Sequence, residues 1–197
     1  MDLKIKNIYF PILSVIILGM VTLSGLKAQA QPSDKAEAKA FVQKFYDWYV
    51  PLYNQYVPGK RNQVPSEKVA LVKQKDCFDA KLYSVLFDYY NKPAPKGAED
   101  VMGIDMDPFL AAQDNGFQYV AGKTTQSAGD FFVDVHGDLE NKPRSEVLKG
   151  QLAIVVELAK VNGQWKFLNF WYDKKSNLLS MIASYNKDVK AEVAKKH

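Results

Sequence analysis

Hydrophobic positions in the first part of the chain follow the 3.6-residue period of an amphipathic α-helix. This pattern predicts a long helix from about residue 35 to about residue 54. Asp34, followed three residues later by Glu37, is typical of a capping box at a helix start. Pro51 lies inside the pattern and is expected to kink or end the helix. The apolar face consists of Phe41, Phe45, Trp48 and Leu52.

Two shorter helical patterns follow. Ser66 is expected to cap the first of them, because serine is preferred immediately before a helix. Asp79 is expected to cap the second for the same reason. The apolar stripe of that second helix consists of Leu82, Val85, Leu86, Tyr89 and Tyr90.

From Phe117 onward the hydrophobic period changes to two, which is typical of half-buried β-strands. Strands are predicted around residues 117–121, 131–135 and 152–158. Asn162-Gly163 then predicts a two-residue hairpin turn into a fourth strand. The pairs expected across this hairpin are Leu158 with Phe167, Val156 with Asn169, and Ile154 with Trp171.

An amphipathic pattern from Leu178 to Val193 predicts a C-terminal helix, with Ser176 or Asn177 as its cap. Helices, then an antiparallel meander, then a helix is the order of an α+β fold. We therefore expect one domain at residues 31–197, with N-terminal helices packed on one face of a curved antiparallel sheet.

The first 30 residues are typical of a secretory signal peptide. Lys4 and Lys6 precede an apolar run at residues 8–23, and Ala28 and Ala30 suit the −3 and −1 positions of a cleavage site. The alternative is an uncleaved anchor, since the run approaches the ~20 residues that span a bilayer. The favoured prediction is a signal peptide at residues 1–30, export across the inner membrane to the periplasm, and no stable membrane insertion after cleavage.

Charge and composition narrow the functional classes. Removing residues 1–30 takes away three lysines and one aspartate, so the formal net charge falls from +4 to +2. A nearly neutral chain lacks the basic surface of a nucleic-acid-binding protein. The single cysteine, Cys77, excludes an intrachain disulfide, and two histidines leave little for a His-rich metal site. No metal or other cofactor is expected.

The most distinctive segment runs from Gly103 to Asp114. Asp107 before Pro108 is typical of a structural cap followed by proline at the first helical position, so a short helix of one or two turns is expected. Asp105 is open to three interpretations: a solvated loop charge, an internal hydrogen-bond anchor, or a polar group that faces a pocket. The spacing of these carboxylates does not match a calcium-binding EF-hand loop.

Three further residues join Asp105 as candidates for ligand or partner binding. Asn169 stands at an apolar position beside Trp171, so its amide either pairs with a loop or helix or points into a pocket. Tyr46 belongs to an aromatic set on the first helix that forms either core or an exposed groove. No Ser–His–acid or Cys–His arrangement is found, so no catalytic residue is assigned.

Three segments together resemble a bacterial domain-of-unknown-function family of small secreted, periplasmic or lipid-anchored proteins. They are the run at residues 103–114, the hairpin at residues 162–170, and the aromatic start of the first helix at residues 41–49. The resemblance extends from about residue 36 to about residue 186. That family is similar to the nuclear transport factor two-like superfamily, which implies a cone-like fold: a bent antiparallel sheet wraps a long helix and leaves a cavity at one end. It implies no catalytic residue.

These observations favour a non-catalytic binding module of the cell envelope. Its partner would be a small molecule or an envelope protein, and a homodimer is a further candidate assembly. The alternative is a cavity enzyme of the isomerase, dehydratase or hydrolase type, in which Asp105 acts as acid or base and Asn169 orients the substrate. That mechanism requires Asp105 to lie in an apolar cavity that Asn169 also reaches.

Overall fold

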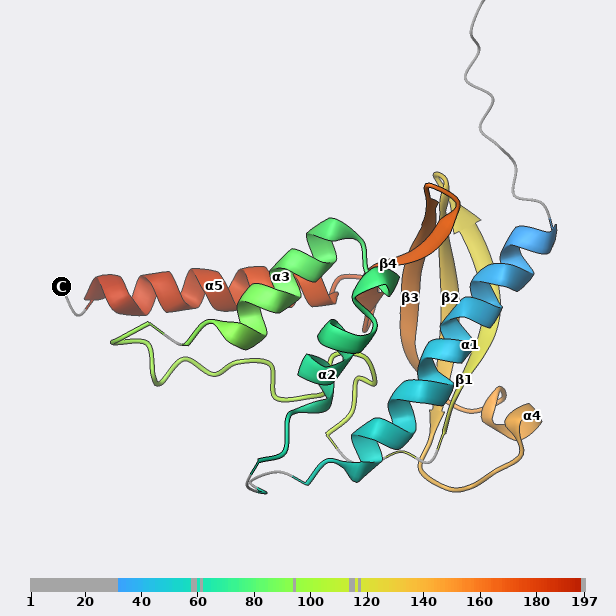
Figure 1. Cartoon of the computed structure of the whole chain (residues 1–197), viewed down its shortest axis with the longest axis horizontal. Coiled ribbons are helices and arrows are strands. Elements are labelled where there is room, and N and C mark those ends of the chain that lie inside the picture. The colour runs from blue at the N-terminus through green and yellow to red at the C-terminus, as the bar shows by residue number, and fades with distance from the viewer. Residues whose placement is uncertain are drawn as a thin grey trace, which may run out of the picture.

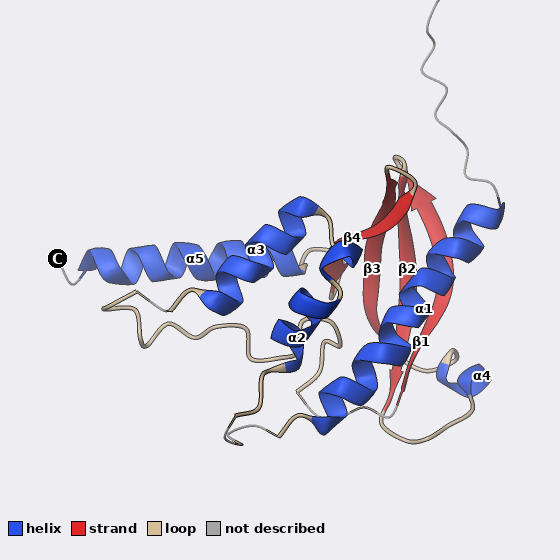
Figure 2. Ribbon diagram, in the orientation of Figure 1, coloured by secondary structure: helices blue, strands red, loops and turns tan. Residues whose placement is uncertain are grey.

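The computed structural model describes residues 32–57, 60, 62–93, 95–113, 116 and 118–195. The predicted signal peptide and Phe117, the expected first residue of the sheet, lie outside these ranges. The elements in chain order are α1 (Pro32–Gln55), α2 (Ser66–Lys73), the 3₁₀ turn η1 (Lys75–Cys77), α3 (Ala80–Asn91), β1 (Gln118–Ser127), β2 (Asp130–Asp138), α4 (Arg144–Val147), β3 (Leu152–Val161), β4 (Gln164–Trp171) and α5 (Leu178–Lys195). The predicted α+β class and the C-terminal helix are confirmed (Figures 1 and 2).

The four strands form one antiparallel sheet in the order β1-β2-β3-β4, so each strand pairs with its neighbour in sequence. Asn162 and Gly163 both have positive φ, at 52° and 78°, as a two-residue hairpin turn requires. The hairpin prediction is therefore confirmed. The pairing register shifts once in each of the three strand pairs, and such irregularities bend and twist strands.

The register shift between β3 and β4 overturns two of the three predicted pairs. Leu158 faces Phe167 as expected, but Asn169 faces Glu157 and Trp171 faces Val155. Strict alternation would place Asn169 on the same face as Phe167. The shift instead brings Phe170 to that face, where its ring lies 5.4 Å from the ring of Phe167. Periodicity alone could not reveal the shift.

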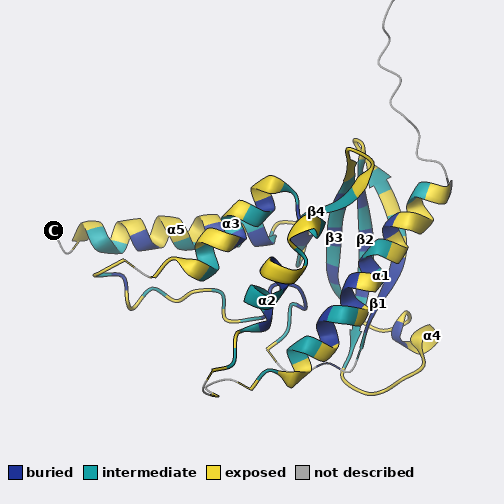
Figure 3. Cartoon of the chain, viewed as in Figure 1, coloured by how far each residue is buried: buried dark blue, intermediate teal, exposed yellow. Residues whose placement is uncertain are grey.

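The core forms where α1 lies across the sheet. The ring of Phe45 packs edge-on against Phe167 of β4 at 5.0 Å, and the ring of Tyr46 stacks on Tyr119 of β1 at 5.6 Å. All four side chains are buried, at 5% exposure or less. The outward side of α1 and most of α5 are exposed (Figure 3). Aromatic contacts thus join the first helix to both edge strands.

Pro51 lies inside α1, which does not end there but continues to Gln55. Two expectations about the N-terminal helices are wrong in detail. Asp34 lies in the first turn of α1, and both Asp34 and Glu37 form ion pairs with Lys160 rather than a capping box. Ser66 is the first residue of α2 rather than its cap, and its buried hydroxyl has no hydrogen-bond partner among the described residues.

Two cap predictions are confirmed. The Asp79 carboxylate accepts hydrogen bonds from the backbone N–H groups of Lys81 and Leu82 at the start of α3. The Asn177 side chain accepts one from the N–H of Ser180 at the start of α5. Both follow the preference of short polar side chains for helix starts.

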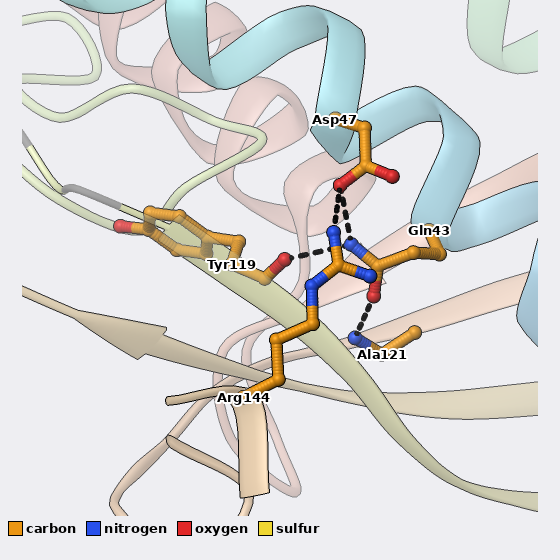
Figure 4. A network of polar contacts seen from close by, with 5 residues as sticks. All are labelled: Gln43, Asp47, Tyr119, Ala121 and Arg144. Carbon is orange, nitrogen blue, oxygen red and sulfur yellow. Dashed lines mark hydrogen bonds and ion pairs between the residues drawn. The ribbon is translucent and has the colours of Figure 1, made fainter. Parts of the chain in front are cut away.

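One side chain covers part of the free edge of β1 (Figure 4). The Gln43 amide nitrogen donates to the carbonyl of Tyr119 at 3.0 Å, and its oxygen accepts from the N–H of Ala121 at 2.8 Å. The same nitrogen reaches Asp47, which also binds Arg144 of α4 at 2.8 Å. Gln43 thereby satisfies backbone groups that a further strand would otherwise bind.

Candidate functional site

The loop at residues 103–113 is fastened to the core by tyrosine hydroxyls. Tyr46 of α1 donates to the carbonyl of Phe109 at 2.8 Å, and Tyr172 donates to that of Pro108 at 2.9 Å. Tyr49 of α1 donates to the Asp107 carboxylate at 2.5 Å. Since each donor belongs to a packed element or its end, the loop is held in one position.

Asp107 organises this loop from within. Its side chain is buried, at 4% exposure, and one carboxylate oxygen accepts from the N–H groups of Phe109 and Leu110, each at 2.9 Å. The predicted capping role of Asp107 therefore has the expected hydrogen bonds. The predicted short helix is wrong, because residues 108–111 form a turn in which the N–H of Ala111 binds the carbonyl of Asp107 and Ala111 has a positive φ of 53°.

The Asp107 carboxyl is an unusual acid. Burial and, to a smaller extent, the negative charge of Glu67 raise its pKa, three hydrogen bonds lower it, and the net value is about 7. Desolvation disfavours the charged form of a carboxyl, which explains the direction. Asp107 is therefore an acid that titrates near neutral pH while serving as a structural anchor.

An open pocket of about 270 Å³ lies between the end of α1, the start of α2 and this loop. We call it the acidic pocket. Burial also raises the pKa of its Glu67 carboxyl. Its lining residues are Tyr53, Tyr56, Glu67, Ile104, Asp105, Met106, Asp107, Ala112 and Gln113.

Asp105 lines the acidic pocket but is exposed, and it accepts a hydrogen bond from the Gln113 amide at 3.2 Å. Its exposure fits a solvated loop charge, and its place in the lining fits a polar group that faces a pocket. The enzyme hypothesis requires Asp105 to lie in an apolar cavity, whereas its side chain is exposed.

Asn169 and Trp171 lie elsewhere, where β4 meets α5. The Asn169 oxygen accepts from the N–H of Phe170 at 3.0 Å and from that of Leu179 at 3.3 Å. The Trp171 indole donates to Glu157 at 2.7 Å. Neither residue lines the acidic pocket, so the structure does not bring Asn169 and Asp105 together. Asn169 binds a backbone group at the start of α5. This contact corresponds to the first alternative for its amide, pairing with a loop or helix.

Tyr46 is 1% exposed, with its hydroxyl bound to the loop and its ring against Tyr119. Of its two interpretations, core fits the structure. Sequence reasoning missed Glu67, a half-buried carboxyl that also lines the acidic pocket. Acidic residues are common in the first turn of a helix because they interact favourably with the helix dipole. Nothing in the local sequence therefore marks Glu67 as a pocket residue.

Among the described residues, no group of three or more His, Cys, Asp or Glu side chains could hold a metal ion. None of the helices in this same part of the chain is long and apolar enough to cross a membrane. Comparison with protein-family models, curated proteins and solved structures found no match to the chain. The site therefore has to be interpreted from its own chemistry.

Proposed function

We propose that this protein is an exported, non-catalytic binding module that holds a small organic cation in the acidic pocket. The observation that carries the proposal is the joint lining of this pocket by the carboxylates of Glu67 and Asp105 and the rings of Tyr53 and Tyr56. Carboxylates bind ammonium and guanidinium groups through charge-assisted hydrogen bonds, and tyrosine faces attract cations. A cation would also relieve the crowding of negative charge around Asp107.

Two observations favour binding over catalysis. The Asp107 carboxylate accepts three hydrogen bonds from its own chain, which makes it an anchor with little capacity left for a substrate. Asp105 is exposed, whereas a cavity enzyme would hold its acid or base in apolar surroundings. A binding role needs only the fixed positions that the tyrosine hydrogen bonds provide.

Export to the periplasm, a cone-like sheet and kinship with the nuclear transport factor two-like superfamily belong to the same proposal. The signal-like N-terminus supports export. The three register shifts support a bent sheet, because each one bends the strand that carries it. In this arrangement the acidic pocket lies at the C-terminal end of α1.

The test is calorimetric titration of the purified protein with choline, arginine and spermidine, with N-acetylglucosamine as an uncharged control. We expect saturable binding of at least one cation, weakened at least about tenfold by Glu67→Gln/Asp105→Asn, which corresponds to about 1.4 kcal/mol. The matched control Glu140→Gln/Glu146→Gln removes two exposed carboxylates outside the pocket and should leave the affinity unchanged. Absence of saturable binding, or equal losses in both double variants, contradicts the proposal.

A further inference from the structure

A second concavity, of about 320 Å³, lies on the outside of α2 and α3, and we call it the α2–α3 groove. Its lining is mostly apolar and includes Val64, Val72 and Phe87. These side chains are 55%, 73% and 44% exposed. Apolar groups this exposed and this close together are typical of a contact surface rather than of scattered surface residues.

Two lysines give the α2–α3 groove its charge. Lys68 and Lys73 line it beside the apolar groups, and neither forms an ion pair with any described residue. An occupant that matches this surface carries an apolar side chain flanked by carboxylates.

The chain itself contains such a segment. Met102 is 81% exposed, the highest value among the exposed large hydrophobic side chains of the described residues. Glu99, Asp100 and Asp105 flank it, and residues 99–105 contain no basic side chain. We call this segment the acidic Met102 loop. Methionine is unbranched and adapts to irregular apolar pockets.

The acidic Met102 loop lies on the other side of α3 from the α2–α3 groove. Phe87 lines the groove, whereas the hydroxyl of Tyr89 accepts a hydrogen bond from the N–H of Ile104 at 2.6 Å. Two positions along an α-helix correspond to a rotation of about 200°, so these side chains leave α3 on opposite faces. The glycine at position 103 leaves room for this hydrogen bond, since a Cβ there would lie 2.7 Å from the Tyr89 hydroxyl oxygen.

We propose that the α2–α3 groove of one copy binds the acidic Met102 loop of a second copy, so that the protein associates head to tail. Met102 would enter the apolar groove while the loop carboxylates meet Lys68 and Lys73. Such a contact joins two different surfaces. A row of associated copies therefore always has one unoccupied groove at one end and one unoccupied loop at the other. The two proposals share Asp105, which lines the acidic pocket, but the association of copies does not require a ligand there.

The experiment is sedimentation velocity of the purified protein over a concentration series. The wild-type protein should show concentration-dependent association that weakens at high salt. Val72→Glu in the groove and Met102→Lys in the loop should each weaken it at least tenfold. A one-to-one mixture of these two variants should form a heterodimer, because one retains an intact loop and the other an intact groove.

Val161→Glu is the matched control, since Val161 is an exposed valine on the β3–β4 hairpin, outside both surfaces. Thermal unfolding checks that each variant folds, and Lys68→Glu/Lys73→Glu replaces Val72→Glu if the latter does not. Three results would overturn the proposal: a monomer at all concentrations, equal weakening by Val161→Glu, or a variant mixture that stays monomeric. If the wild type associates but the variant mixture stays monomeric, the association does not use the groove–loop contact.

Discussion

Asp107 illustrates how the surroundings of one side chain set its chemistry. Aspartate before proline predicts a cap, and the carboxylate does bind the two N–H groups that a cap would bind. The sequence contains no sign that this carboxylate is also buried next to Glu67 and Tyr49, which approach it from α2 and α1. Local pattern therefore predicted the hydrogen bonds, whereas tertiary packing determined the acidity.

The burial of Asp107 makes folding stability depend on pH. Its folded-state pKa is about 7, against about 4 in an unfolded chain. Between these values the folded protein binds more protons than the unfolded chain, so the free energy of unfolding falls as pH rises. We expect urea unfolding to show a loss on the order of 3 kcal/mol from pH 4 to pH 7, relative to Asp107→Asn.

Asp107→Asn is the appropriate reference because asparagine keeps an acceptor for the two backbone N–H groups and does not titrate. Glu67 remains in both proteins, so the desolvation that raises its own pKa contributes to both pH profiles. Parallel pH profiles for the wild type and Asp107→Asn would contradict the assignment.

At the scale of elements, the register shift in β4 determines which side chains reach the core. Both Phe167 and Phe170 are fully buried, although strict alternation would place them on opposite faces. Asn169 consequently contacts the start of α5. The pocket hypothesis for Asn169 began from the wrong face, since alternation assumes a regular strand.

Edge protection by Gln43 leads to a prediction at the same scale. Gln43→Met keeps the length of the side chain but removes both hydrogen bonds to β1. We expect a loss of about 1–2 kcal/mol in the free energy of unfolding, and faster hydrogen exchange at the amide of Ala121.

Arg144→Gln is the control, because Arg144 belongs to the same network through its ion pair with Asp47. Their side chains are 60% and 50% exposed, and such pairs contribute about 0–1 kcal/mol. Equal exchange at Ala121 in the wild type and Gln43→Met would show that Gln43 does not protect the edge.

At the scale of the whole molecule, Phe45 joins segments that are distant in sequence. Its ring lies 5.0 Å from Phe167 of β4, 5.6 Å from Phe109 of the loop, and 6.3 Å from Phe78 before α3. The helices, the sheet and the loop of the acidic pocket thus share one aromatic core.

Phe45→Ala should lower the free energy of unfolding by about 3–5 kcal/mol, the usual effect of emptying a buried aromatic site. Because Phe109 packs on Phe45, hydrogen exchange should also increase at the loop amides of Phe109 and Leu110. Phe87→Ala removes a ring that is 44% exposed and should have a much smaller effect. If hydrogen exchange increased only in α1 and stayed unchanged at Phe109 and Leu110, the shared core would be contradicted.

Local sequence patterns were enough to predict the α+β class, the order of the elements, the Asn162-Gly163 hairpin and the caps Asp79 and Asn177. These depend on periodicity and on contacts within a few residues, which local sequence records. The register of β4, the burial of Asp107 and the lining of the acidic pocket became known from the folded chain alone. Each of these depends on segments far apart in the chain: Tyr49 and Asp107 are 58 positions apart, and no local pattern encodes their approach.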